Sequence, residues 1–71
     1  MKRIDLQGAK PVIIAVFGTA AELARAIKLD RFRVTAWVRN NRVPATMRDR
    51  VVKAAKKRGF KITAEQLRGD L

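Results

Sequence analysis

The sequence predicts a small all-α domain of four to five helices, with room for short β segments at the two termini. Three observations predict this fold: apolar residues recur at helical spacing, typical helix-capping residues precede those segments, and turn-forming residues separate them. The 71 residues allow a single domain, residues 1–71, with one small core, which we expect tight helix packing or dimerisation to stabilise.

The charge balance is strongly positive: 17 Lys and Arg residues face six Asp and Glu residues, giving a formal net charge of +11. Such a charge indicates a polyanionic partner, a membrane surface or an acidic protein, and nucleic acid is favoured because phosphate contacts dominate its affinity. The absence of cysteine and histidine excludes disulfides and the usual zinc sites, and it fits a cytoplasmic protein. No apolar run reaches the roughly 20 residues needed to cross a bilayer.

The first helix is expected to begin near Pro11, a residue that suits the first turn of a helix. Residues 1–9 before it carry weak signals and predict a flexible, largely irregular arm, with a short strand as the alternative. The run Val12–Phe17, taken alone, is typical of a buried strand. We expect a helix because the following unit needs a third helix to cover its apolar side. Helical spacing then places three residues on the core side: Ile13, Val16 and Phe17.

The stretch from Thr19 to Arg39 predicts two helices joined by a tight turn, and the rest of the chain is organised around this unit. The pattern Thr19-x-x-Glu22 is a capping box at the start of the first helix. Asp30 is a typical N-cap for the second, and the spacing of Leu29 and Val34 is that of a hydrophobic staple. Asn40-Asn41 is a plausible end of this second helix. The inward positions are apolar or small: Leu23, Ala24, Ile27, Val34, Trp37 and Val38.

Pro44 opens a further helix whose apolar positions Met47, Val51 and Ala54 recur at helical spacing. Gly59 ends it, and residues 59–71 form a C-terminal tail in which Thr63-x-x-Gln66 predicts one or two helical turns. Basic residues cover the outer face of the helix: Arg48, Arg50, Lys53, Lys56, Lys57 and Arg58. This cluster predicts either a solubilising surface or, in part, phosphate contacts.

The order and spacing of these residues resemble the helix-turn-helix of phage Cro-type repressors and the related YdaS-type regulators, which have a lambda-repressor-like fold. The resemblance covers residues 11–58 and, more loosely, the tail. It rests on these residues as a set: Phe17-Gly18-Thr19, Ala24, Leu29, Val34, Trp37 and Val43-Pro44. One position departs from the family, in which the first turn residue is usually glycine because its φ is often positive. Here it is Lys28, and a lysine in that conformation costs on the order of 1 kcal/mol.

The resemblance implies that helix 31–39 lies in the major groove of double-stranded DNA, where its outward side chains meet base edges. The implied base contacts are Arg31, Phe32, Thr35, Ala36 and Arg39. The implied phosphate contacts are Thr19, Ala20, Arg25, Lys28, Arg33, Arg42 and Arg48. Arginine pairs well with guanine, and apolar side chains such as Phe32 and Ala36 suit the methyl group of thymine.

Each of these residues also has a purely structural interpretation. The arginines are compatible with a solvated surface, and Phe32 with burial against a neighbour or a dimer partner. Trp37 falls on the apolar face and is expected in the core, while Glu22 and Asp30 are expected to cap helices rather than form an acid–base pair. The sequence offers no catalytic, metal-binding or cofactor-binding cluster, so neither an enzyme nor a small-molecule substrate is expected.

The sequence therefore predicts a sequence-specific transcriptional regulator, a Cro-like repressor of phage or mobile-element origin, acting on the nucleoid in the cytoplasm. A homodimer is expected to read a pseudo-palindromic operator, with either Phe60, Ile62 and Leu67 or the N-terminal arm as the dimer surface. Three alternatives stay open. The first is a winged-helix excisionase-like protein, which needs a β wing soon after Pro44. The others are a basic antitoxin or anti-repressor that binds an acidic protein, and a nonspecific DNA-coating protein.

Overall fold

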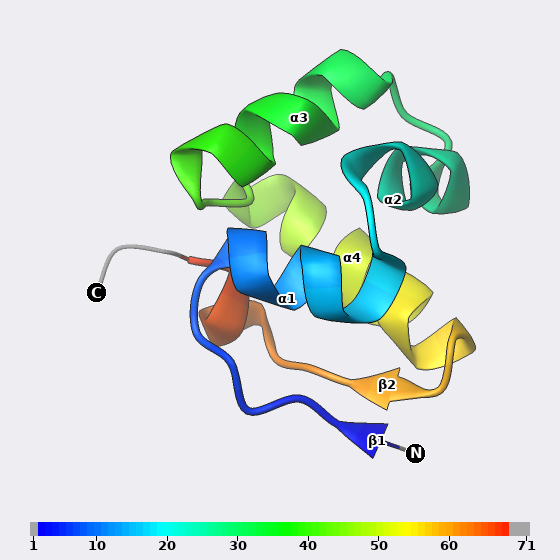
Figure 1. Cartoon of the computed structure of the whole chain (residues 1–71), viewed down its shortest axis with the longest axis vertical. Helices are drawn as coiled ribbons and strands as arrows, with labels where there is room; N and C mark the ends of the chain where they lie inside the picture. Colours follow the sequence, from blue (N-terminus) through cyan, green and yellow to red (C-terminus); the bar gives the residue numbers. More distant parts are fainter. Residues whose placement is uncertain (1, 69–71) are drawn as a thin grey trace.

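Four α-helices make up most of the structure, a computed structural model that describes residues 2–68 (Figure 1). They are α1 (Ala9–Phe17), α2 (Ala20–Ile27), α3 (Arg31–Asn40) and α4 (Ala45–Lys57). Two short strands, β1 (Lys2–Arg3) and β2 (Phe60–Lys61), pair in parallel, and a 3₁₀-helix, η1 (Ala64–Leu67), follows β2. The prediction of a helical domain with short β segments near its termini is confirmed.

One face of every α-helix contributes to a single core. In Figure 1, α2 and α3 form the upper part of the molecule, α1 crosses the middle, and the strands and η1 lie below it. The core side chains are Ala9, Val12, Ile13, Val16, Phe17, Leu23, Ala24, Ile27, Val34, Trp37, Val43, Val51, Ala54, Ala55, Ile62 and Leu67. The predicted burial of Trp37 is confirmed, as is that of the three inward residues of α1.

The β-branched run in α1 is helical, because packing against α2 and α3 outweighs the local preference for a strand. The helix begins at Ala9, two residues before the expected start at Pro11. Pro11 still lies in the first turn, where its missing N–H leaves no intrahelical bond unmade. Gly18 ends α1 with φ 87°, a conformation that glycine adopts without strain.

Only half of the capping box predicted for α2 forms. The Thr19 hydroxyl oxygen accepts the backbone N–H of Glu22 at 3.2 Å. The Glu22 carboxylate does not return to Thr19, since its oxygens lie 3.6 Å from Arg25 and 3.5 Å from Arg58. Two guanidinium groups offer a carboxylate stronger charge-assisted partners than one backbone N–H, and the prediction of a reciprocal box is wrong in this half.

The turn between α2 and α3 has the left-handed geometry that makes Lys28 unusual. Lys28 takes φ 57° and ψ 47°, and the N–H of Leu29 donates to the carbonyl of Ala24 at 2.9 Å. This bond is characteristic of the Schellman motif that closes many helices. The next helix begins at once, because Asp30 Oδ1 accepts the N–H of Phe32 at 2.9 Å. The predicted tight turn and the predicted Asp30 cap are both confirmed.

The end of α3 is joined to the start of α1 through one asparagine. Asn41 takes φ 56°, as expected for the end of α3, and its Oδ1 accepts the N–H of Lys10 at 2.8 Å. It therefore satisfies one of the unpaired N–H groups at the start of α1. A Cβ atom at Gly8 would lie 2.8 Å from both the nitrogen and the oxygen of the Asn41 amide. A side chain at position 8 would therefore push the Asn41 amide away from its place, and the φ of 102° is strained for residues other than glycine.

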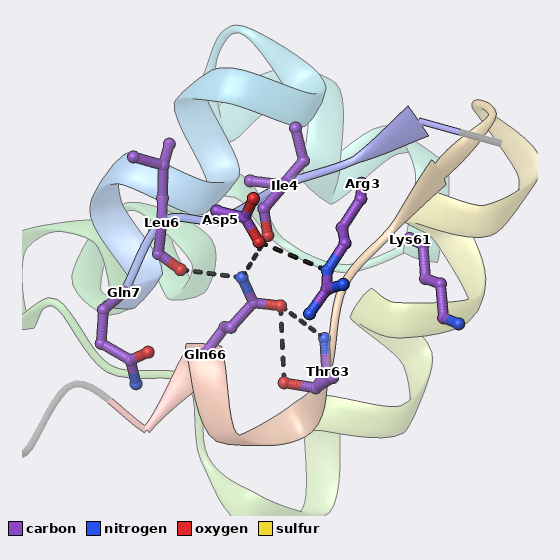
Figure 2. A pocket seen from close by; sticks show the side chains of 8 residues that line it. All are labelled: Arg3, Ile4, Asp5, Leu6, Gln7, Lys61, Thr63 and Gln66. Carbon is purple, nitrogen blue, oxygen red and sulfur yellow. Dashed lines mark hydrogen bonds and ion pairs between the residues drawn. The ribbon is translucent and has the colours of Figure 1, made fainter.

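Residues 2–8 are mostly irregular, as expected, but hydrogen bonds to the tail hold them in place. Besides the β1–β2 pairing, the N–H of Gly8 donates to the carbonyl of Gln66 at 2.8 Å. The Gln66 amide nitrogen donates to the carbonyls of Ile4 and Leu6, and its oxygen accepts the N–H of Thr63 (Figure 2). The expectation of a flexible arm is corrected here, because one side chain satisfies backbone groups on both segments. We call residues 2–8 and 59–67 together the clasp.

Candidate nucleic-acid interface

The outward face of α3 carries all five residues predicted to meet bases, and all of them are exposed: Arg31, Phe32, Thr35, Ala36 and Arg39. Spacings of three, four and seven residues place side chains on the same side of a helix. The opposite side holds Val34 and Trp37 in the core, and this contact determines which residues of α3 face solvent. The helix therefore presents a continuous surface that has no role in packing within the described chain.

Phe32 is the most exposed large apolar side chain of the described residues, with 70% of its surface accessible. Its predicted alternative, burial against a neighbour within the chain, does not occur. The guanidinium carbon of Arg31 lies 5.5 Å from the centre of the Phe32 ring, a cation–π arrangement. An aromatic ring beside a positive charge at the start of an exposed helix face is suited to contact with both bases and phosphates.

The cations around this face are unneutralised. Lys28, Arg31, Arg33, Arg39 and Arg42 are exposed, and none of them forms an ion pair within residues 2–68. The Asp30 carboxylate at the start of the helix is engaged in its cap. Because the cations outnumber this one carboxylate, the surface carries a net positive charge and attracts polyanions.

The residues predicted to contact phosphates differ in their exposure and in the contacts that they already make within the chain. Thr19 is exposed, whereas Ala20 is half-buried against the core. Arg25 is exposed but shares Glu22 with Arg58. Arg48 is half-buried, and its Nε donates to the carbonyl of Val43 at 2.9 Å. That bond supports the loop before α4, so Arg48 has a structural role that the sequence did not indicate.

Two shallow hollows run beside α3, between it and the start of α4. One, of about 270 Å³, is lined by Arg33, Ala36, Trp37, Pro44, Thr46 and Met47. The other, of about 280 Å³, is lined by Trp37, Asn40, Arg42 and Pro44. They bring the exposed Asn40 and Thr46 next to the predicted interface. Neither residue was among the contacts predicted from the sequence, although Asn and Thr side chains commonly contact phosphates.

No protein-family model, curated protein or solved structure matches this chain. The functional interpretation consequently depends on the geometry and the charges described above. Within residues 2–68, none of the helices has both the length and the apolar character needed to cross a membrane.

Arg58, the last residue of the basic cluster, directly follows α4 and has a structural role. The Arg58 guanidinium lies 5.2 Å from the centre of the Phe17 ring and 3.5 Å from the Glu22 carboxylate. It also donates to the carbonyl of Val16 at 3.4 Å. Arg58 therefore links α1, α2 and the end of α4, and no local pattern in the sequence distinguishes it from its basic neighbours.

The structure also bears on the predicted dimer surface and on the winged-helix alternative. Ile62 and Leu67 are 4% and 0% exposed, so the prediction that they form a dimer surface is wrong, because both are part of the core. Phe60 is only half-buried and can still contribute to a dimer surface. After Pro44 the chain forms α4, in the place where a winged-helix protein would need a β wing.

Proposed function

We propose that this chain is a sequence-specific DNA-binding regulator, a Cro-like repressor that inserts α3 into the major groove. One observation carries the proposal. Val34 and Trp37 hold the inner side of the helix in the core, and the outer side presents an exposed phenylalanine and arginines that form no ion pair within residues 2–68. The resemblance to phage Cro-type and YdaS-type regulators, drawn from the residues alone, supports the same assignment.

The proposed roles follow the chemistry of the outward side chains. Arg31 and Arg39 offer bidentate donors to guanine, and Phe32 and Ala36 offer apolar contact to thymine methyl groups. Thr35 bonds a base or a phosphate. Around them Arg33 and Arg42 neutralise phosphates, and the N–H groups at the start of α2 beside Thr19 are a natural site for an anion.

A single 71-residue module reads few base pairs, and we propose that a homodimer reads two half-sites of a pseudo-palindromic operator. The half-sites would lie about 34 Å apart, one turn of DNA. Phe60 and Val52 line a hollow of about 340 Å³ that is available as a dimer contact. The proposed setting is the nucleoid in the cytoplasm, which suits a chain without cysteine.

Selection of binding sites from random double-stranded DNA at near-physiological salt tests the proposal. A specific regulator is expected to enrich one pseudo-palindromic sequence and to bind it about 1,000-fold or more tighter than random DNA. Equal affinity for all sequences would contradict the proposal and favour a nonspecific coating protein. Absence of DNA binding at low salt would instead favour a basic antitoxin or anti-repressor with an acidic protein partner.

A further inference from the structure

A second basic surface lies between the end of α2 and the C-terminal half of α4, and it shares Lys28 alone with the cations described around α3. A hollow of about 210 Å³ there is lined by four cations, Lys28, Arg50, Lys53 and Lys57, and by three small or apolar residues, Ala26, Ile27 and Ala54. All four cationic residues are exposed. We call this surface the basic hollow.

The positive charge of the basic hollow is not balanced within the described chain. None of its four cations forms an ion pair in residues 2–68. The carboxylates nearest along the chain are Asp30, which caps α3, and the exposed Asp49, which precedes Arg50 and forms no ion pair with the four cations. Holding several like charges around one hollow destabilises a small domain unless an anion is bound there, and this favours a role in binding.

We propose that the basic hollow binds the phosphate backbone of nucleic acid, as a contact independent of the outward face of α3. Arg50, Lys53 and Lys57 form a stripe along one side of α4, with the spacing i, i+3 and i+7. Such a stripe is about 10 Å long, at 1.5 Å per residue. Successive phosphates of one DNA strand advance about 3.4 Å along the duplex axis and lie farther apart along the winding backbone, so a stripe of this length reaches two or more of them.

The lack of exposed large apolar side chains in the hollow favours nucleic acid as its partner over a membrane or an acidic protein. The exposed large apolar residues of the described chain are Leu6, Ile14 and Phe32, and none of them lines the hollow. Membrane-binding surfaces insert such side chains into the lipid, and protein interfaces are anchored by buried aromatic residues. A cationic surface without them is suited to a hydrated backbone of phosphates.

The test compares two triple variants that remove equal charge. In the first, Arg50, Lys53 and Lys57 are each replaced by Gln; in the control, Lys2, Lys10 and Lys61 are replaced by Gln. All six residues are exposed, so both variants are expected to keep the helical circular dichroism of the parent. The measured quantity is the dependence of affinity for a random-sequence duplex on salt, from about 50 to about 200 mM.

The hollow variant is expected to lose about 2–3 from the magnitude of the slope of log K against log salt, because each phosphate contact contributes about 0.9. The control is expected to lose less than about 1. Equal slopes for the two variants would overturn the proposal. So would a hollow variant that loses binding to polyglutamate while its DNA slope stays at the control value, since the partner would then be an acidic protein.

The phosphates can belong to the duplex held by α3 or to a second duplex, and a further measurement separates these sources. Two duplexes carry a donor and an acceptor dye, and energy transfer between them reports bridging. Transfer that is present with the control and lost in the hollow variant assigns the contact to a second duplex. A changed slope without transfer in any protein assigns it to the same duplex.

The outcome is also separable from that of the proposed function. The double variant Arg31→Ala, Arg39→Ala is expected to lose sequence preference and to keep the salt dependence due to the basic hollow. If the parent protein shows no sequence preference but the hollow variant still loses slope, the proposed function fails and this inference stands. If sequence preference is found and the slopes are equal, the reverse holds.

Discussion

The α2–α3 unit and the clasp are both built from short elements, but local interactions along the sequence determine the first and distant interactions determine the second. In the α2–α3 unit the N-caps and the turn lie within a few residues of their cause, as with Asp30, whose carboxylate caps the helix beginning at the next residue. In the clasp the partners are far apart in the chain, as with Gln66, which binds the carbonyls of Ile4 and Leu6. The first unit leaves its outer surface unused for packing, whereas the second closes the fold.

From this difference we expect the clasp to contribute to stability and the outward face of α3 to contribute to DNA preference, and mutations can test both expectations. Substitutions in the clasp are expected to change stability and leave DNA preference intact. Substitutions on the outward face of α3 are expected to do the reverse, because those side chains touch solvent rather than the core. The following predictions run from the largest expected effect to the smallest.

Leu67→Ala is expected to lower the free energy of unfolding by about 2–5 kcal/mol, because it opens a cavity at a fully buried leucine. Urea denaturation followed by circular dichroism measures the change. Leu6→Ala is the matched control, since Leu6 is 42% exposed and its loss is expected to cost less than about 1 kcal/mol. Similar losses for the two variants would mean that the tail is not an integral part of the core.

Gln66→Ala is expected to cost about 1–3 kcal/mol, because the carbonyls of Ile4 and Leu6 and the N–H of Thr63 lose their partner. Hydrogen exchange is expected to accelerate in residues 2–8 and not in α2 or α3. Gln7→Ala serves as control, since the Gln7 amide makes one exposed bond to the carbonyl of Glu65. Uniform acceleration along the chain would show that the clasp does not unfold separately.

Arg31→Ala is expected to weaken binding to the selected operator by about 1–3 kcal/mol and to relax preference at one base pair. The unfolding free energy is expected to stay within about 0.5 kcal/mol of the parent, because the side chain is exposed. Arg42→Ala is the comparison, expected to weaken all sequences alike. An unchanged preference after Arg31→Ala would show that α3 is not the reading helix. Arg48 is unsuitable for this comparison because its bond to Val43 supports the fold.

Lys28→Gly is expected to raise the unfolding free energy by up to about 1 kcal/mol, since glycine relieves the left-handed strain at φ 57°. Ala26→Gly, two residues earlier and inside α2, is expected to lower it by about 1 kcal/mol. Thermal unfolding of the two variants thus gives shifts of opposite sign. A loss of stability in both would mean that Lys28 makes a favourable contact that outweighs its strain.

The features that sequence could predict are those with a local cause. Asp30 and Thr19 were recognisable as caps because each acts on the next few backbone groups, whereas the left-handed turn at Lys28 was implied by the family resemblance. The exposed residues of α3 followed from the same logic, since they are what a helix leaves outside once Val34 and Trp37 are buried.

The features that sequence could not predict depend on distant partners. Nothing near Asn41 indicates that its side chain caps α1, and nothing near Arg58 indicates that Phe17 will lie beneath its guanidinium. Glu22 is the clearest example. Its position in the sequence favours a reciprocal cap, but in the fold its carboxylate pairs with Arg58, which follows α4. The expected flexibility of the N-terminal arm and the expected dimer role of Ile62 and Leu67 were wrong for the same reason, because the contacts of both segments come from distant parts of the chain.

Asn41 has a consequence for the design of variants. Its left-handed backbone ends α3 and its side chain caps α1, where the amide lies so close to Gly8 that a Cβ atom at position 8 would collide with it. Randomising the five outward positions of α3 while keeping Asn41 and Gly8 is therefore expected to yield a library of stably folded proteins. If α3 reads DNA as proposed, such a library would change the target preference without changing the scaffold that presents it.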